Sequence, residues 1–113
     1  MTPHIDAGVF NELRRMTDAA FIAQLVETFL EDAPAQFTLM QAALAEGDPE
    51  DLRRAAHSVK SNAATFGAGR LAEMARELED LAKAGRLEGA QTRLVEIEML
   101  FGSVAQELRE LSR

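Results

Sequence analysis

The stretch Ala56–Ala68, AHSVKSNAATFGA, holds the residues of this 113-residue chain whose types and spacing best suit chemistry. His57 is one of only two histidines, and Lys60 follows it at the third position. A neutral imidazole nitrogen can be a nucleophile near pH 7, because an ordinary histidine has a pKa of roughly 6.5. These residue types permit nucleophilic chemistry at His57, although a lone histidine can equally be an ordinary surface residue.

The helix expected over Pro49–Phe66 presents His57 to solvent. On a helical wheel of roughly 100° per residue, a buried stripe falls within about 60° of Val59, made of Leu52, Ala55, Ala56, Ala63 and Phe66. His57 lies about 160° from Val59, nearly opposite that stripe. Its own face carries basic and small residues one or two turns away, Arg53, Arg54, Lys60, Ser61 and Ala64. The basic residues could balance a phosphoryl group or simply solvate the face, and the small ones would let another protein approach closely.

Two helices are expected before this one. Asp6 is a suitable N-cap for a short first helix with core-facing residues Val9, Phe10, Leu13 and Met16. Thr17 or Asp18 would cap a second helix with an amphipathic face of Phe21, Ile22, Leu25 and Phe29. Proline bends or breaks a helix interior, so Pro34 predicts a kink or a restart before the apolar stripe continues toward Gly47.

The strongest helix start is Asp48-Pro49, which combines a capping aspartate with proline at the first helical position. Gly67 should end the helix that begins there. Another helix then runs to near Gly85, and a Leu-rich last helix begins around Glu88. Gly102 lies inside the last helix, where it costs roughly 1 kcal/mol relative to alanine, so close packing is expected there.

The predicted architecture is all-α, an antiparallel four-helix bundle with a short additional N-terminal helix, in a single domain over residues 1–113. Strand-like alternation is missing, and 47% hydrophobic residues can fill a core. A net charge of −7 disfavours general binding to nucleic acid or anionic membranes. The sequence has no cysteine, no membrane-spanning apolar run and no signal peptide in MTPHIDAGVF, so we expect a cytoplasmic protein.

From His57 onward the chain resembles the histidine-containing phosphotransfer (HPt) domain family. The shared pattern is His57, Lys60, small residues at Ser61-Asn62-Ala63, Gly67-Ala68 with Leu71, and then Leu78-Glu79. A helix ending in FLED, an Ala-Leu stretch before Gly47 and a Leu-rich final helix extend the resemblance over essentially the whole chain. The chain departs from the pattern at Ser61, where many members have glycine.

This resemblance implies that His57 accepts a phosphoryl group from a phospho-aspartate in one receiver domain and passes it to another. It also implies that Lys60 lies close to the phosphohistidine, that Gly67 belongs to a helix junction and that Glu79 orients the imidazole. Ser61, Arg53 and Arg54 would lie near the phosphate.

The chain would then be a monomeric phosphocarrier rather than an enzyme. Its partners would be response-regulator receiver domains and a hybrid histidine kinase. We expect no cofactor of its own, because the receiver should bring Mg²⁺. Val9, Leu13 and Ala64 are the expected partner-binding residues, whereas Phe21 is expected to pack in the core.

Three other functions stay open. A receiver-binding module without phosphotransfer is possible, although the presence of both His57 and Lys60 argues against it. A helical scaffold or dimerisation bundle would leave the exposed basic cluster unexplained. A metal-dependent helical enzyme is disfavoured because His4 and His57 are the only histidines and neither belongs to a Glu-x-x-His pair.

Overall fold

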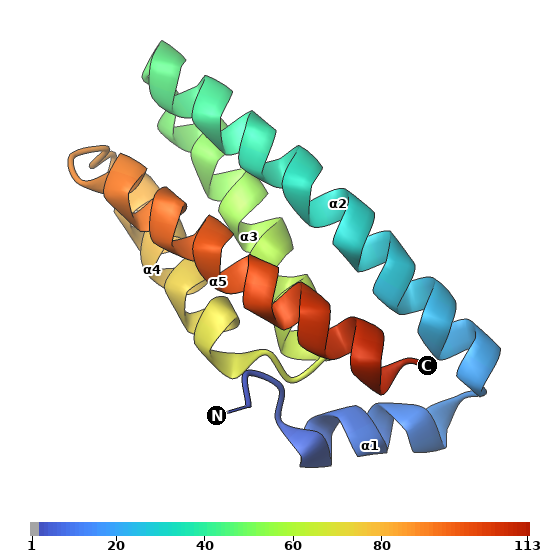
Figure 1. Cartoon of the computed structure of the whole chain (residues 1–113). Coiled ribbons are helices and arrows are strands. Elements are labelled where there is room, and N and C mark those ends of the chain that lie inside the picture. The colour runs from blue at the N-terminus through green and yellow to red at the C-terminus, as the bar shows by residue number, and fades with distance from the viewer. Residues whose placement is uncertain (1–2) are drawn as a thin grey trace.

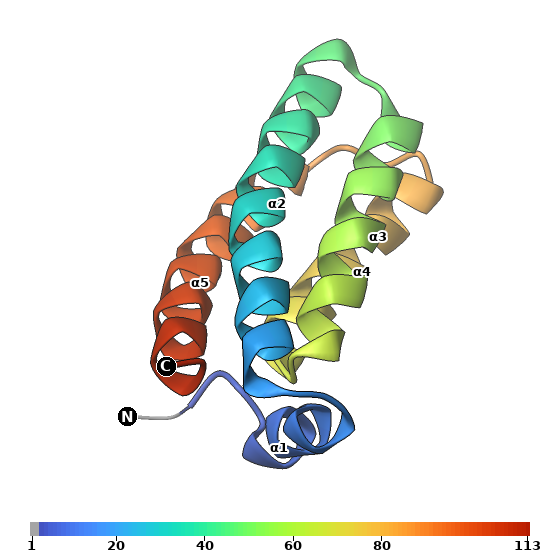
Figure 2. The same cartoon turned by 90° about the vertical axis from the view of Figure 1, so that its right-hand side faces the viewer.

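The computed structural model describes residues 3–113, which form five helices and no strand (Figure 1). These helices are α1 (Ala7–Met16), α2 (Ala19–Glu46), α3 (Pro49–Thr65), α4 (Gly69–Lys83) and α5 (Ala90–Leu111). Helices α2 to α5 pack lengthwise as an antiparallel bundle, and α1 crosses one end of it (Figures 1 and 2). The predicted all-α bundle with an additional N-terminal helix is therefore confirmed. No helix in the described part of the chain is long and apolar enough to cross a membrane.

Aspartate side chains start three of the helices. Asp6 accepts a hydrogen bond from the backbone N–H of Val9 at 3.1 Å, and Asp18 accepts one from Phe21 at 2.8 Å. Asp48 does the same for Asp51 at 3.1 Å, with Pro49 as the first helical residue. Each cap satisfies an N–H group that has no partner within its helix. The expected caps are confirmed, and the second helix uses Asp18 rather than Thr17.

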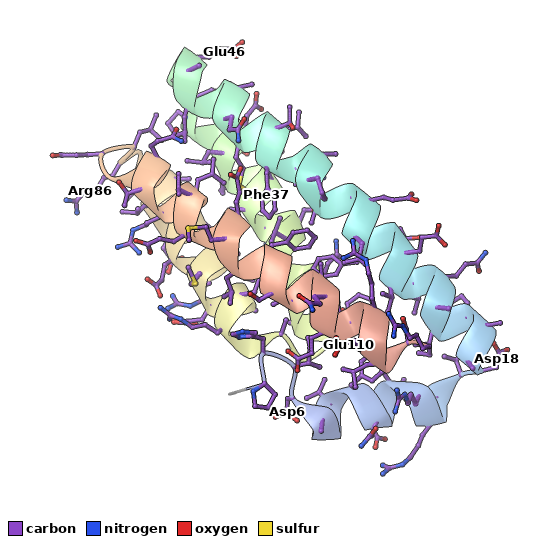
Figure 3. All side chains as sticks on the ribbon, viewed as in Figure 1. Asp6, Asp18, Phe37, Glu46, Arg86 and Glu110 are labelled. Carbon is purple, nitrogen blue, oxygen red and sulfur yellow. The ribbon has the colours of Figure 1, made fainter. Side chains whose placement is uncertain are left out.

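Four phenylalanines join α2, the end of α3 and α5 at the centre of the bundle. Phe29 stacks on Phe66 with ring centroids 5.3 Å apart, and Phe101 meets Phe29 edge-on at 5.7 Å. Phe37, which points into the bundle in Figure 3, meets Phe101 edge-on at 5.4 Å. Offset and edge-on contacts are the favoured geometries for aromatic pairs. The cluster fixes the three helices against one another, and the buried stripe predicted for α3 is found as expected.

Pro34 does not end the second helix, so the restart, one of the two outcomes predicted there, is wrong. Helix α2 continues from Ala19 to Glu46 with Pro34 inside it. Proline removes one N–H donor from the helix, leaving the carbonyl of Leu30 without its usual partner. Pro34 lies on the exposed side of α2, where water can hydrate that carbonyl.

Several residues expected in the core lie at the surface instead. Met16 is 75% exposed and Val9 is also exposed, because α1 crosses the end of the bundle and buries only Phe10. Phe21 is 47% exposed, since Ile22 takes the core-facing position one residue later. Surface-exposed apolar residues, Phe21 among them, are common and by themselves need no special explanation.

Gly102 is exposed on α5, and a methyl group added there would meet no atom within 4 Å. The close packing expected at this glycine is therefore wrong. Met99, on the same helix, is also exposed.

Replacing Gly102 with alanine should stabilise the protein by up to about 1 kcal/mol, because glycine is the costlier residue in an exposed helix interior. Urea unfolding would measure the change. Gly47→Ala is the matched control: Gly47 is equally open but has a φ of 67°, so alanine there should destabilise. A Gly102→Ala variant less stable than the wild type would contradict this account.

Candidate functional site

Glu79 is the one charged side chain that is buried in the described part of the chain, with 2% of its side-chain surface exposed. Burial by itself raises the pKa of Glu79. Hydrogen bonds from Lys60 and His57, with the positive charges of Lys60 and Lys83, outweigh burial and leave the pKa of Glu79 below its ordinary value. The carboxylate is therefore ionised at neutral pH and must be paired by its neighbours.

His57 lies on the exposed face of α3, directly beside this carboxylate. Its Nδ1 is 2.8 Å from Oε2 of Glu79, and its side chain is 54% exposed. An ionised carboxylate can only accept hydrogen bonds, so Nδ1 carries the proton in this contact. A neutral ring in this tautomer keeps its lone pair on Nε2. The arrangement leaves Nε2 as the available nucleophilic atom.

Two lysines complete the surroundings of the Glu79 carboxylate. Nζ of Lys60 lies 2.8 Å from Oε1, and Nζ of Lys83 lies 3.8 Å from Oε2. Lys60 is half-buried on α3, whereas Lys83 is more exposed, one turn after Glu79 on α4. Lys83 was not among the site residues predicted from the sequence. Its signal was the spacing of four between Glu79 and Lys83, which places two opposite charges together on a helix.

The two arginines predicted near the phosphate make their ion pairs elsewhere on α3. Arg53 donates to both carboxylate oxygens of Glu50, at 3.0 and 2.6 Å, and Arg54 lies 3.5 Å from Glu50 and 3.8 Å from Asp51. The hydrogen-bonded Arg53 guanidinium is the main cause that lowers the pKa of Glu50 to about 2. Glu50 and Asp51, rather than the site carboxylate, are thus the ion-pair partners of the two arginines.

Gly67 connects the end of α3 to the N-terminal segment. It has a φ of 80°, and its carbonyl accepts a hydrogen bond from the backbone N–H of Asp6 at 2.8 Å. A Cβ at this position would lie 2.9 Å from Cβ of Val9 and 3.1 Å from the Asp6 carbonyl oxygen. Glycine is therefore required here for two reasons, the left-handed backbone and the close approach of another segment. The predicted helix junction is also where α1 docks.

The predicted partner-binding residues gather at this end of the bundle. Val9 and Leu13 of α1 line a shallow groove together with Met16 and with Thr65 of α3. Ala64, next to Thr65, is exposed on the face that also carries Ser61 and His57. The exposed face of α3 and one side of α1 therefore bring these small and apolar residues together.

Comparisons with known proteins agree on the family to which this chain belongs. The family model of the Hpt domain matches residues 24–112. The crystal structure of histidine-containing phosphotransfer protein B (HptB) from Pseudomonas aeruginosa PAO1 superimposes with a TM-score of 0.91 at 30% identity, covering 99% of this chain and 96% of that chain. No curated protein sequence matches the chain.

The chain therefore belongs to the Hpt domain family. It is a histidine phosphotransfer protein of a two-component phosphorelay.

Replacing Glu79 with glutamine should reduce stability at pH 7 by about 1 kcal/mol, because Lys60 loses its counter-charge. The folded-state pKa of Glu79 is lowered, so the ionised carboxylate stabilises the fold above its ordinary pKa of 4.5. That contribution is lost as the pH falls through the folded-state pKa. The difference in unfolding free energy between wild type and Glu79→Gln, measured with urea, should therefore be constant near neutrality and shrink in acid. A difference that stays the same from neutral to acidic pH would refute this.

Proposed function

We propose that Nε2 of His57 is the atom that carries the phosphoryl group. The observation that supports this most directly is the 2.8 Å contact between Nδ1 of His57 and Oε2 of Glu79. This contact fixes the proton on Nδ1 and leaves the lone pair of Nε2 free. Because the His57 ring is exposed and Glu79 is buried, another protein could reach Nε2 without disturbing the Glu79 carboxylate.

The transfer reaction proposed for this site needs no proton movement at the ring. The Nε2 lone pair attacks the phosphorus atom of an aspartyl phosphate, and the bond from phosphorus to the aspartate oxygen breaks as the phosphorus–Nε2 bond forms. Nδ1 keeps its proton, and the positive charge that develops on the ring is stabilised by Glu79. Lys60 balances the charge on the phosphoryl oxygens. The reverse sequence returns the group to a second aspartate.

The same proposal names the partners. Receiver domains of response regulators would supply and accept the phosphoryl group, and a hybrid histidine kinase would stand upstream. Mg²⁺ would be held by the receiver, and this chain would act as a phosphocarrier without a kinase site or cofactor of its own. We further propose that residues 1–113 act as one domain, as a monomer in the cytoplasm. The family match supports the class of partners.

A receiver domain would dock along the exposed face of α3 and onto α1. Ser61 and Ala64 are small and exposed on the His57 side of α3, so a partner backbone could approach closely. Val9 and Leu13 offer apolar surface at the end of the same face. Apolar residues surrounded by a polar rim are typical of a protein interface.

Replacing His57 with glutamine should abolish labelling, because no other group in the site offers a free imidazole nitrogen. The wild type should acquire an acid-labile, base-stable phosphate when incubated with phosphorylated receiver domains of the source organism, or with phosphoramidate as a small donor. His4→Gln is the matched control and should label normally. Normal labelling of His57→Gln would show that His57 is not the phosphorylated residue. Receiver binding without labelling of the wild type would instead identify a receiver-binding module.

Replacing Lys60 with alanine should slow transfer at least tenfold while the fold stays intact, because its ammonium group balances charge in the transition state. Transfer reactions stopped at successive times give the rate of phosphoryl transfer, and circular dichroism gives the helix content. Lys83→Ala is the matched control; its Nζ lies 3.8 Å from the carboxylate instead of 2.8 Å, so its effect should be smaller. Lys60→Ala that transfers as fast as wild type would show that Lys60 has no chemical role. A variant that fails to fold would instead mean that Lys60 is structural.

A further inference from the structure

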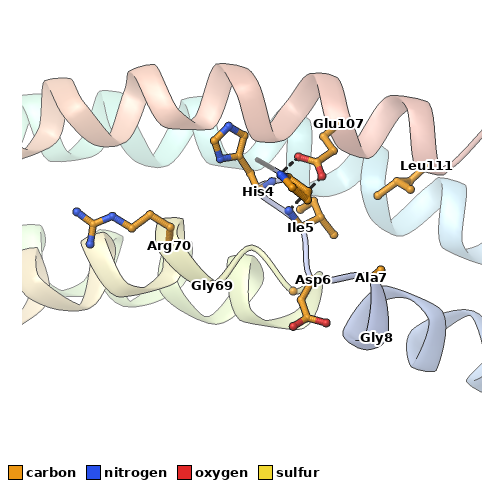
Figure 4. Close-up of a pocket in the computed structure, with 11 residues that line it drawn as sticks. His4, Ile5, Asp6, Ala7, Gly8, Gly69, Arg70, Glu107 and Leu111 are labelled. Atoms are coloured by element: carbon orange, nitrogen blue, oxygen red, sulfur yellow. Dashed lines mark hydrogen bonds between the residues drawn. The ribbon is translucent and has the colours of Figure 1, made fainter. Parts of the chain in front are cut away.

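The N-terminal segment Pro3–Asp6 lies across the end of the bundle and is held there by the carboxylate of Glu107 (Figure 4). The backbone N–H of His4 donates to Oε2 of Glu107 at 2.8 Å, and that of Ile5 donates to Oε1 at 3.2 Å. One carboxylate of α5 therefore satisfies two consecutive N–H groups about 100 positions away in the sequence. Hydrogen bonds to an ionised group are roughly twice as strong as neutral ones.

One further contact attaches α1 to the same region of α5, and two buried side chains anchor the segment in the core. The side chains of Ile5 and Phe10, on either side of the α1 start, are buried in the core. The Arg14 guanidinium donates to the carbonyl of Leu111 and lies 4.7 Å from the centre of the Phe10 ring. Both ends of the N-terminal region are thus tied to the last two turns of α5.

Helix α1 depends on this attachment for its own structure. It has ten residues, whereas isolated helices shorter than about 12 to 15 residues are marginal in water. Without Glu107 the N–H groups of His4 and Ile5 lose their acceptor, in a place that is only partly open to solvent. Such a loss favours local release of the segment over unfolding of the whole bundle.

Release of the segment would remove Val9 and Leu13 from beside Thr65, but it would leave the pair of His57 and Glu79 intact on α3 and α4. We propose that Glu107 is a positioning residue for receiver docking, which acts through the N-terminal segment and not on the reacting atoms. This inference rests on the proposed function. It predicts that Glu107 controls how tightly a receiver binds, while the reactivity of His57 is independent of it.

The test compares wild type, Glu107→Ala and Glu107→Gln with Glu110→Gln, an exposed glutamate three residues later on α5, as the matched control. Glutamine keeps the size of the side chain but offers a single acceptor oxygen, so one N–H loses its partner. Phosphoramidate labelling reports the reactivity of His57 without any docking; its phosphorus–nitrogen bond breaks, the bond to Nε2 forms, and ammonia leaves. KM and kcat are then measured with the receiver that exchanges fastest in the labelling screen.

Glu107→Ala should raise KM for the receiver about tenfold, because only the fraction of molecules with α1 docked binds well. Glu107→Gln should give a smaller increase, and Glu110→Gln none. Amide exchange at Ile5 and Phe10 should accelerate in the Glu107 variants, while phosphoramidate labelling stays within twofold of wild type. If Glu107→Ala does not fold, Glu107→Gln is used for the same measurements.

Faster amide exchange with an unchanged KM would overturn the inference, because α1 would then be dispensable for docking. Phosphoramidate labelling that falls together with receiver transfer would also overturn it, since Glu107 would then support the site as a whole. A wild-type protein that phosphoramidate and receivers both fail to label would overturn the proposed function, and this inference with it.

Discussion

The arrangement around His57 follows from the burial of one carboxylate. Glu79 is ionised and almost fully enclosed, so the fold must bring donors to both of its oxygens. His57 and Lys60 can do so only if α3 and α4 keep a fixed register, since residues 57 and 79 are 22 positions apart. That register is set by apolar packing of side chains such as Val59 and Leu78, which are fully buried between the helices. Apolar packing therefore positions His57 and Lys60, and these two donors keep the Glu79 carboxylate ionised.

Stability alone gives little reason for such a carboxylate, because apolar residues of similar size often stabilise a core as well as a buried ion pair does. The charges explain its presence better. Two ammonium groups, on Lys60 and Lys83, face the single carboxylate of Glu79, so the site has one unit of positive charge in excess. A phosphoryl dianion on a positively charged imidazole ring would neutralise that excess. This charge balance supports the proposed phosphorylation of His57.

The fold could be predicted from sequence where local rules decide the outcome. The boundaries of α3 followed from its aspartate cap and from Gly67. The outward direction of His57 followed from the 3.6-residue period, because α3 is covered on one side only. Burial in α1 could not be predicted, since it depends on how a short helix crosses the bundle end. The role of Glu79 came from family resemblance, and the only local signal for Lys83 was its spacing of four from Glu79. No local pattern indicated Glu107, whose partners are set by tertiary packing.

Gly67 joins the helix that carries His57 to the N-terminal segment that carries Val9. It ends α3 in a left-handed conformation and accepts the N–H of Asp6, and the absence of a side chain lets Val9 approach. The glycine that terminates the histidine-bearing helix therefore also sets where α1 lies relative to that helix. A receiver that contacts both Val9 and His57 needs their separation to be constant. A left-handed turn with a backbone hydrogen bond provides part of that constancy, and the contacts of Glu107 with the same N-terminal segment provide another part.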